Sequence, residues 1–302
     1  MPRLRRFFTR GAIGGFGVAI ILAMTAAMSP WSATNAEAAT TTSAFYLDLG
    51  ASVSVGVQPT TAVPKGQPTD HGYANDLVAM EAAQGVTRQL TQLGCPGESL
   101  NTFINGGDHC YTGSDTQFSD ALVFLKAHYY QAGLVTIDLG WNTLRPCFVG
   151  SSVDATCVSQ SIATVQQQLT HVIGTLKAAA GPNVTFIGVG HYDPFYAKVL
   201  SGATGRAFAA HSTPGIRTFN DTLRSVYTSF AIPFANVAKA FHEYVGATTQ
   251  LANGVAVSGN AAVACTLTWM CAPPPFGPNS HPTDAGYQVI ANTIAALIPS
   301  TL

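Results

Sequence analysis

Short apolar runs bounded by turn residues recur along the chain and predict buried strands. Three of them, Ala44–Leu49, Leu134–Leu139 and Val184–Val189, are rich in β-branched, aromatic and other apolar residues, which is typical of strands that are covered on both faces. A shorter strand is expected near Pro233–Val237. These runs are the candidate members of one buried sheet.

Apolar residues that recur at intervals of three and four predict helices between these strands. One such stretch ends before Gly181-Pro182, a second covers roughly Thr218–Phe230, and the last covers about Thr283–Ile298. The first stretch ends where glycine and proline stop a helix. Because strands and helices alternate, the pattern predicts an α/β fold of three layers, with a parallel sheet covered by helices on both sides.

The N-terminus has the pattern of an export signal. Arginines precede an apolar run over residues 11–28, and Ala36-Glu37-Ala38 supplies a small-x-small cleavage site. The pair Arg5-Arg6 also resembles a twin-arginine motif, and an ordinary secretion signal is an equal alternative. We therefore expect a signal at 1–38 and one mature domain at 39–302. A retained anchor is disfavoured by the four glycines in the apolar run.

Charge and composition narrow the classes of function. Cleavage after Ala38 removes four of the 14 basic and one of the 15 acidic residues, which leaves a mature net charge of about −4. No basic patch remains that would favour nucleic acid as a partner. The charged fraction of 10% is typical of a compact extracellular protein rather than a disordered one. We expect a secreted monomer that is not stably inserted in a membrane after signal cleavage.

Polar residues with catalytic potential follow two predicted strands. Ser52 lies in the turn Gly50-Ala51-Ser52 directly after the first strand, where a tight turn lifts a side chain toward the start of the next helix. Asn142 follows Gly140-Trp141 after the strand Leu134–Leu139. Because the carboxyl ends of parallel strands meet at one edge of a sheet, Ser52 and Asn142 can converge there. Taken singly, a serine or asparagine in such a turn is more often structural.

Ser52, Gly97, Asn142 and His281 stand in four short blocks that follow one another along nearly the whole mature chain. In order and spacing these blocks resemble the SGNH (GDSL) hydrolase superfamily. The resemblance implies Ser52 as nucleophile and His281 as general base. It also implies an oxyanion hole made by the main-chain N–H groups of Ser52 and Gly97 and by the Asn142 side chain.

Three longer strings bring the chain closest to secreted actinobacterial esterases and lipases. They are Leu93–Glu98, Leu267–Cys271 and His281–Tyr287. The resemblance implies that the parallel central sheet is flavodoxin-like, with a three-layer α/β/α architecture. It also implies an ester substrate and neither a cofactor nor a metal.

Six cysteines in an exported chain predict three disulfides. Fifteen connectivities are open to six cysteines, but these six fall into three local pairs, and sequential pairing is similar to the pattern in the secreted relatives. A zinc site is disfavoured because no Cys-x-x-Cys and no close Cys/His cluster exists. The expected pairs are Cys95 with Cys110, Cys147 with Cys157, and Cys265 with Cys271.

Besides Leu267, which stands where the relatives have Trp, the sequence departs from the family pattern at two positions that matter for the chemistry. Ala51 replaces the usual aspartate before the serine, and Pro278 stands where the acid that orients the histidine would be. The histidine could instead be oriented by the side chain of Asn279 or Asp284, or by a main-chain carbonyl in the disulfide-closed stretch 265–271, which contains Trp269. We favour the carbonyl, because a small closed loop is stiff and a carbonyl accepts the Nδ1–H without a buried charge.

Two further features are expected near the substrate. His191 follows the strand Val184–Val189 and therefore points toward the crevice, where it either contacts substrate or is structural. Residues 57–70, rich in Pro, Thr and Gly, have no periodicity and are expected to form one wall of the entrance.

The sequence therefore predicts a secreted serine hydrolase that cleaves carboxylic esters, with a small-molecule or lipid ester as its partner. Two alternatives remain open. A carbohydrate O-deacetylase would use the same blocks, although no aromatic-rich carbohydrate module is visible. A catalytically silent envelope binding protein would explain the changes at Ala51 and Pro278.

Overall fold

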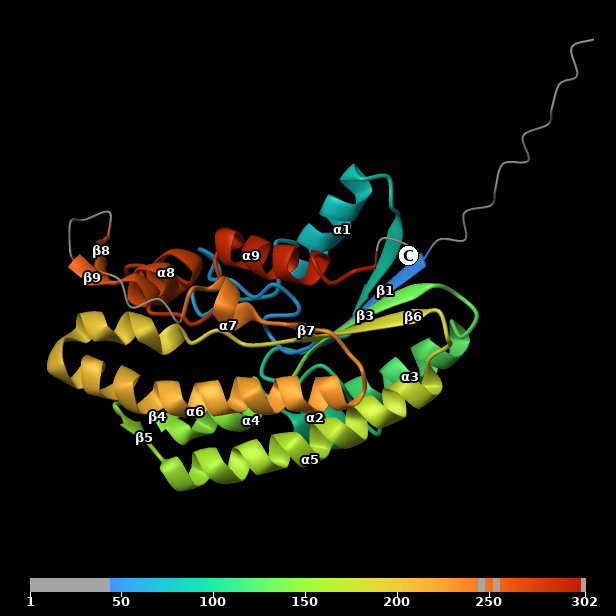
Figure 1. The fold of residues 1–302 in the computed structure, drawn as a ribbon, viewed down its shortest axis with the longest axis horizontal. Helices are drawn as coiled ribbons and strands as arrows, with labels where there is room; N and C mark the ends of the chain where they lie inside the picture. Colours follow the sequence, from blue (N-terminus) through green and yellow to red (C-terminus); the bar gives the residue numbers. More distant parts are fainter. Residues whose placement is uncertain (1–43, 244–247, 252–255, 300–302) are drawn as a thin grey trace, which may run out of the picture. The chain divides into compact units, whose positions relative to one another are not determined.

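Figure 1 shows the fold in a computed structural model, which describes residues 44–243, 248–251 and 256–299. The expected export signal at 1–38 lies outside these residues. The described residues all belong to one compact unit. Within the described ranges, no helix combines the length and apolar character that a membrane span requires.

A five-stranded, all-parallel sheet forms the centre of the fold. Its strands lie in the order β2 (Arg88–Gln92), β1 (Ala44–Gly50), β3 (Gly133–Asp138), β6 (Val184–Val189) and β7 (Phe234–Ala235). This order is the flavodoxin-like arrangement, and the four strands expected from the sequence are all present. The fold class is therefore confirmed.

Helices cover both faces of the sheet, as Figure 1 shows. Alternate residues of β1 enter two separate cores: Tyr46 packs on one side, and Phe45, Leu47 and Leu49 pack on the other. The Tyr46 side is covered by α1 (Tyr73–Ala83), α7 (Val237–Ala240) and α9 (Asp284–Ala295), and the opposite side by α2 (Leu100–Asn105), α3 (Gln117–Ala127), α5 (Ala155–Ala179) and α6 (Gly202–Ser229).

The α6 helix is longer than its apolar pattern predicts. It begins at Gly202 rather than near Thr218, and it contains Pro214. Its first half buries mainly small residues, which give little periodic signal.

The remaining elements are α4 (Trp141–Leu144), β4 (Phe148–Val149), β5 (Ser152–Val153), β8 (Thr248–Gln250), β9 (Ala256–Ser258), α8 (Gly259–Leu267) and the 3-10 turns η1 (Arg145–Cys147), η2 (Pro194–Ser201) and η3 (Trp269–Cys271).

Candidate active site

Ser52 lies at the carboxyl end of β1, in a series of turns over residues 51–56 that we call the serine turn. The N–H of Val57 donates to the Ser52 carbonyl at 2.9 Å and closes this segment. No helix begins here, since the first helix starts only at Tyr73. The tight turn expected after the first strand is therefore present, and hydrogen-bonded turns rather than an adjoining helix hold the serine.

The serine turn is fixed by a side chain that the sequence did not single out. Gln117, fully buried at the first position of α3, accepts from Gly50 N at 2.7 Å and donates to Gly50 O at 2.9 Å. Its amide also donates to a Glu98 carboxylate oxygen at 3.1 Å. Gln117 thus links the last residue of β1, directly before the serine turn, to residues 94–99, which we call the glycine loop. No pattern in the sequence marks Gln117, and its burial is seen only in the structure.

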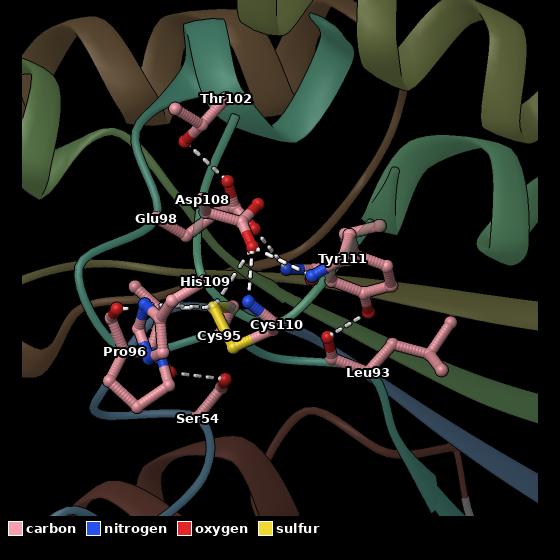
Figure 2. Close-up of a disulfide and its surroundings, with 12 residues drawn as sticks. Ser54, Leu93, Cys95, Pro96, Glu98, Thr102, Asp108, His109, Cys110 and Tyr111 are labelled. Carbon is pink, nitrogen blue, oxygen red and sulfur yellow. Dashed lines mark hydrogen bonds between the residues drawn. A yellow bond between two sulfur atoms is a disulfide. The ribbon is translucent and has the colours of Figure 1, made fainter. Parts of the chain in front are cut away.

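Gly97 occupies the glycine loop with φ of +88°, a conformation that residues with a Cβ rarely adopt. A Cβ built at Gly97 meets no atom within 4 Å, so its neighbourhood is open. Figure 2 shows how the Cys95–Cys110 disulfide joins this loop to the following segment. There Asp108 accepts from the N–H of Cys110 at 2.7 Å. The loop is therefore held by a covalent bond and a hydrogen-bonded turn.

Asn142, near the start of α4, is tied to the same loop. Its side-chain amide donates to the Glu98 carbonyl at 3.1 Å. The Glu98 carboxyl is fully buried and accepts from Thr102 and Gln117. Burial raises the pKa of Glu98 to about 7. One N–H of Asn142 is used in this contact, and the amide group carries a second.

His281 is oriented by Asn279. The imidazole Nδ1 lies 2.7 Å from the Asn279 side-chain oxygen, which also accepts from the His281 main-chain N–H at 3.0 Å. The Asn279 Nδ2 donates to the Lys65 carbonyl at 3.0 Å. The His281 N–H is a donor and the Lys65 carbonyl is an acceptor, so these two contacts fix which end of the Asn279 amide is oxygen and which is nitrogen. Nδ1 must therefore carry the proton, and Nε2 keeps its lone pair.

The prediction that a main-chain carbonyl accepts from this imidazole is therefore wrong. The Trp269 carbonyl accepts from Asn279 N at 3.1 Å, and the Trp269 N–H donates to the His281 carbonyl at 3.0 Å. The Asp284 carboxylate instead accepts a hydrogen bond from the Gln58 side-chain amide at 2.7 Å. The disulfide-closed turn thus aligns the backbone of residues 279–283 and leaves the imidazole to the Asn279 side chain.

All three disulfides have the expected sequential pairing. The described residues contain no free cysteine. The expectation that no close Cys/His cluster exists is wrong, because the fold brings Cys95, His109 and Cys110 together. Both groupings of Cys, His and acidic residues found among the described residues include Cys95, whose sulfur is bonded to Cys110, so neither offers a free thiolate to a metal. The pairs are Cys95–Cys110, Cys147–Cys157 and Cys265–Cys271.

Ser52, Gly97, Asn142 and His281 line one cavity of about 310 Å³, which we call the serine cavity. Lys65 and Gly66, from the loop expected to form a wall of the entrance, line it as well. Burial, and secondarily the charge of Arg145, lower the pKa of His281 to about 4. The imidazole is therefore neutral at neutral pH, as a proton acceptor must be.

His191 also lines the serine cavity. Its ring stacks on Trp141 with centroids 4.2 Å apart, and its Nδ1 lies 2.6 Å from the Tyr192 carbonyl. Burial lowers the pKa of His191 to about 4. Tyr192 in turn donates to the Ser280 carbonyl at 2.7 Å, beside His281. The structural expectation for His191 thus has a physical basis, and its position at the cavity also permits a contact with substrate.

The sequence matches no family model and no curated protein, whereas the fold is similar to several solved structures. An extracellular lipase from Streptomyces rimosus is 17% identical with a TM-score of 0.54, over 85% of this chain and 100% of that one. A phospholipase A1 from Streptomyces albidoflavus NA297 is 17% identical with a TM-score of 0.51, over 84% and 98%. The lipase Lip_vut3 from a goat rumen metagenome is 15% identical with a TM-score of 0.51, over 84% and 97%.

At these identities the likeness concerns the fold. It confirms the α/β/α fold that the resemblance to SGNH hydrolases implied. One cavity brings together Ser52, Gly97, Asn142 and His281 from the four blocks that carried the resemblance.

Proposed function

We propose that this chain is a secreted serine hydrolase that cleaves carboxylic esters of acyl or lipid-like character through an acyl-enzyme. The observation that carries the proposal is the convergence of Ser52, Gly97, Asn142 and His281 on one cavity from four distant segments. Three of the solved structures with this fold are named as lipases or a phospholipase, which supports an ester substrate.

In the first half of the reaction, Nε2 of His281 takes the hydroxyl proton of Ser52 as the serine oxygen attacks the ester carbonyl. The carbonyl oxygen becomes negative and accepts hydrogen bonds from the main-chain N–H groups of Ser52 and Gly97 and from the Asn142 amide. One such donor is worth roughly 2.7 to 4 kcal/mol of transition-state stabilisation. The imidazolium then gives its proton to the departing alcohol.

In the second half, water attacks the acyl carbonyl on Ser52 while His281 again accepts the proton. The bond between the acyl group and the serine oxygen then breaks, the imidazolium returns the proton to that oxygen, and the carboxylic acid leaves. Asn279 keeps Nδ1–H directed away from the serine throughout, which leaves Nε2 as the reactive nitrogen. A neutral amide stabilises the imidazolium less than a carboxylate does. Asn279 therefore contributes orientation and tautomer selection and adds no charge to the buried site.

Export rests on separate observations. The basic, apolar and small-x-small pattern of residues 1–38 is that of a cleaved signal. The three disulfides are those of a protein that folds in an oxidising compartment. Mass spectrometry of the protein recovered from culture medium tests this point, since cleavage after Ala38 predicts a mature chain that begins at Ala39.

The enzymatic proposal is tested with the mature protein and a short-chain 4-nitrophenyl ester. Ser52→Ala should abolish hydrolysis because the nucleophile is lost. Ser159→Ala is the matched control, since Ser159 is an exposed residue of α5. Activity above about a tenth of wild type in Ser52→Ala would contradict the assignment. A wild-type protein that hydrolyses no ester would favour the silent binding protein.

A further inference from the structure

A second cavity of about 580 Å³ adjoins the serine cavity, and we call it the side cavity. Lys65, Trp141, Arg145, Ser280 and His281 line both cavities, so the two lie next to each other at the imidazole. An ester that reaches Ser52 can therefore extend into the side cavity.

The charges that line the two cavities all have one sign. Lys65 and Arg145 line both, and Lys198 lines the side cavity. No aspartate or glutamate lines either one. The ion pairs formed by described residues involve other groups, so the three cations have no acidic partner there. The mature chain carries a net charge of about −4, so this positive region opposes the charge of the whole protein.

The side cavity combines these cations with an aromatic wall. Phe148 and Phe195 contact each other with ring centroids 5.3 Å apart. The Lys198 ammonium lies 5.1 Å from the centroid of the Phe208 ring. All three rings line the cavity together with Met270. The cavity therefore offers an apolar surface and, at its junction with the serine cavity, two exposed cationic groups.

We propose that the substrate is an ester that carries an anionic group, a phosphate or a carboxylate, close to the scissile carbonyl. Arg145 and Lys65 hold this group at the junction of the cavities, and the apolar part of the substrate lies against the aromatic wall. A guanidinium matches the paired oxygens of either anion. Cations in a cleft without acidic neighbours also raise the local concentration of anionic substrate. The inference rests on the proposed function and names its substrate class.

The test uses two matched pairs of esters. The mono-4-nitrophenyl ester of glutaric acid is compared with its methyl-capped diester, followed by nitrophenol release. Dibutyroyl phosphatidylglycerol is compared with dibutyroylglycerol, followed by butyrate release. We expect kcat/KM at least about tenfold higher for the anionic member of one pair, because hydrogen bonds to a charged group are stronger than those between neutral groups. The pair that shows the preference identifies a carboxylate or a phosphate.

The preference should depend on the two cations. Arg145→Gln and Lys65→Gln should each lower the ratio of kcat/KM between the anionic and neutral esters, mainly through KM. The wild-type ratio should also fall as salt screens the cations. Lys126→Gln is the matched control, because Lys126 is an exposed residue of α3 that lines neither cavity.

A ratio near one in both pairs, or a ratio that neither glutamine variant lowers, would overturn the inference while leaving the proposed function intact. Hydrolysis of none of the four esters would overturn the proposed function, and the inference with it. The two failures are therefore distinguishable.

Discussion

Ser52 and His281 line the same cavity, but they reach it from segments that are built differently. The serine turn continues β1, which has a neighbouring strand on each side, and Gln117 is hydrogen-bonded to both main-chain groups of Gly50. The histidine lies in residues 268–283, which we call the histidine segment and which pairs with no strand of the sheet. A disulfide-closed turn, a bridge between Thr268 and Pro282, and the Asn279 side chain hold it.

The difference explains why sequence reasoning worked better for one region than for the other. A buried strand has a readable apolar pattern, and a residue just after it inherits its position from the sheet. The positions of Ser52 and Asn142 could thus be predicted. The partner of His281 is set by a few hydrogen bonds that follow no repeating pattern. Asn279 and the Trp269 carbonyl are both near enough in sequence to accept from the imidazole, so the sequence alone could not decide between them. Only the fold shows that the carbonyl is already bonded to Asn279 N.

The same reasoning applies to the supports of the site. Gln117 has no motif, and its two bonds to Gly50 join residues 67 positions apart. The first half of α6 lacks apolar periodicity because it packs through small residues. By contrast, each disulfide joins two cysteines that are close in sequence, and all three pairs were predicted.

The largest expected effect concerns Asn279. Asn279→Leu removes the acceptor of Nδ1–H, so the imidazole loses its tautomer and its orientation. We expect kcat to fall by about a hundred- to ten-thousandfold, the upper figure being that for loss of a triad carboxylate. Asn279→Asp keeps an acceptor and should retain at least about a tenth of the activity. Steady-state kinetics with a neutral nitrophenyl ester measures both variants. A kcat for Asn279→Leu within tenfold of wild type would show that another group orients His281.

A substitution of Gln117 measures how much its hydrogen bonds stabilise the end of β1 and the serine turn. Gln117→Leu leaves the Gly50 N–H and one Glu98 carboxylate oxygen without this partner, whereas the Gly50 carbonyl keeps the N–H of Cys95 at 3.2 Å. Each buried unsatisfied group costs about 1 to 3 kcal/mol. We expect the free energy of unfolding to fall by at least about 2 kcal/mol and kcat by roughly tenfold. Urea denaturation and ester kinetics measure the two. Gln167→Leu, at an exposed position of α5, is the control. Equal stability of the two variants would contradict this role of Gln117.

The disulfides compare the two regions directly. Opening Cys265–Cys271 by a double Cys→Ser change should lower kcat by roughly tenfold, since the histidine segment depends on that turn. Opening Cys95–Cys110 should lower kcat by less than about threefold, because Gln117 and Asn142 also hold the glycine loop. Loss of either bond should cost about 2 to 3 kcal/mol of stability. Thermal unfolding and kinetics at matched folded fractions separate the effects, and the reverse order of kcat would refute the comparison.

The smallest effect is on the pH profile. The base must be neutral to act, and its pKa is lowered from 6.5 to about 4. The acid limb of kcat/KM should therefore lie well below pH 6.5, with activity retained as pH falls toward about 4. Because the charge of Arg145 contributes to this lowering, Arg145→Gln should move the limb upward. Circular dichroism at each pH checks that the protein is folded, and a wild-type limb centred at pH 6.5 or above would be inconsistent with the buried imidazole.

Labelling with a fluorophosphonate tests the central claim most directly, because this reagent bonds to a serine only when a base and an oxyanion site activate it. Treatment of the mature protein at neutral pH, followed by intact mass and peptide mapping, should give one adduct on the peptide that contains Ser52. The adduct should be absent in Ser52→Ala and strongly reduced in His281→Ala. An adduct on Ser54 or another serine, or no adduct on a folded wild-type protein, would contradict the assignment of Ser52 as the nucleophile of an ester hydrolase.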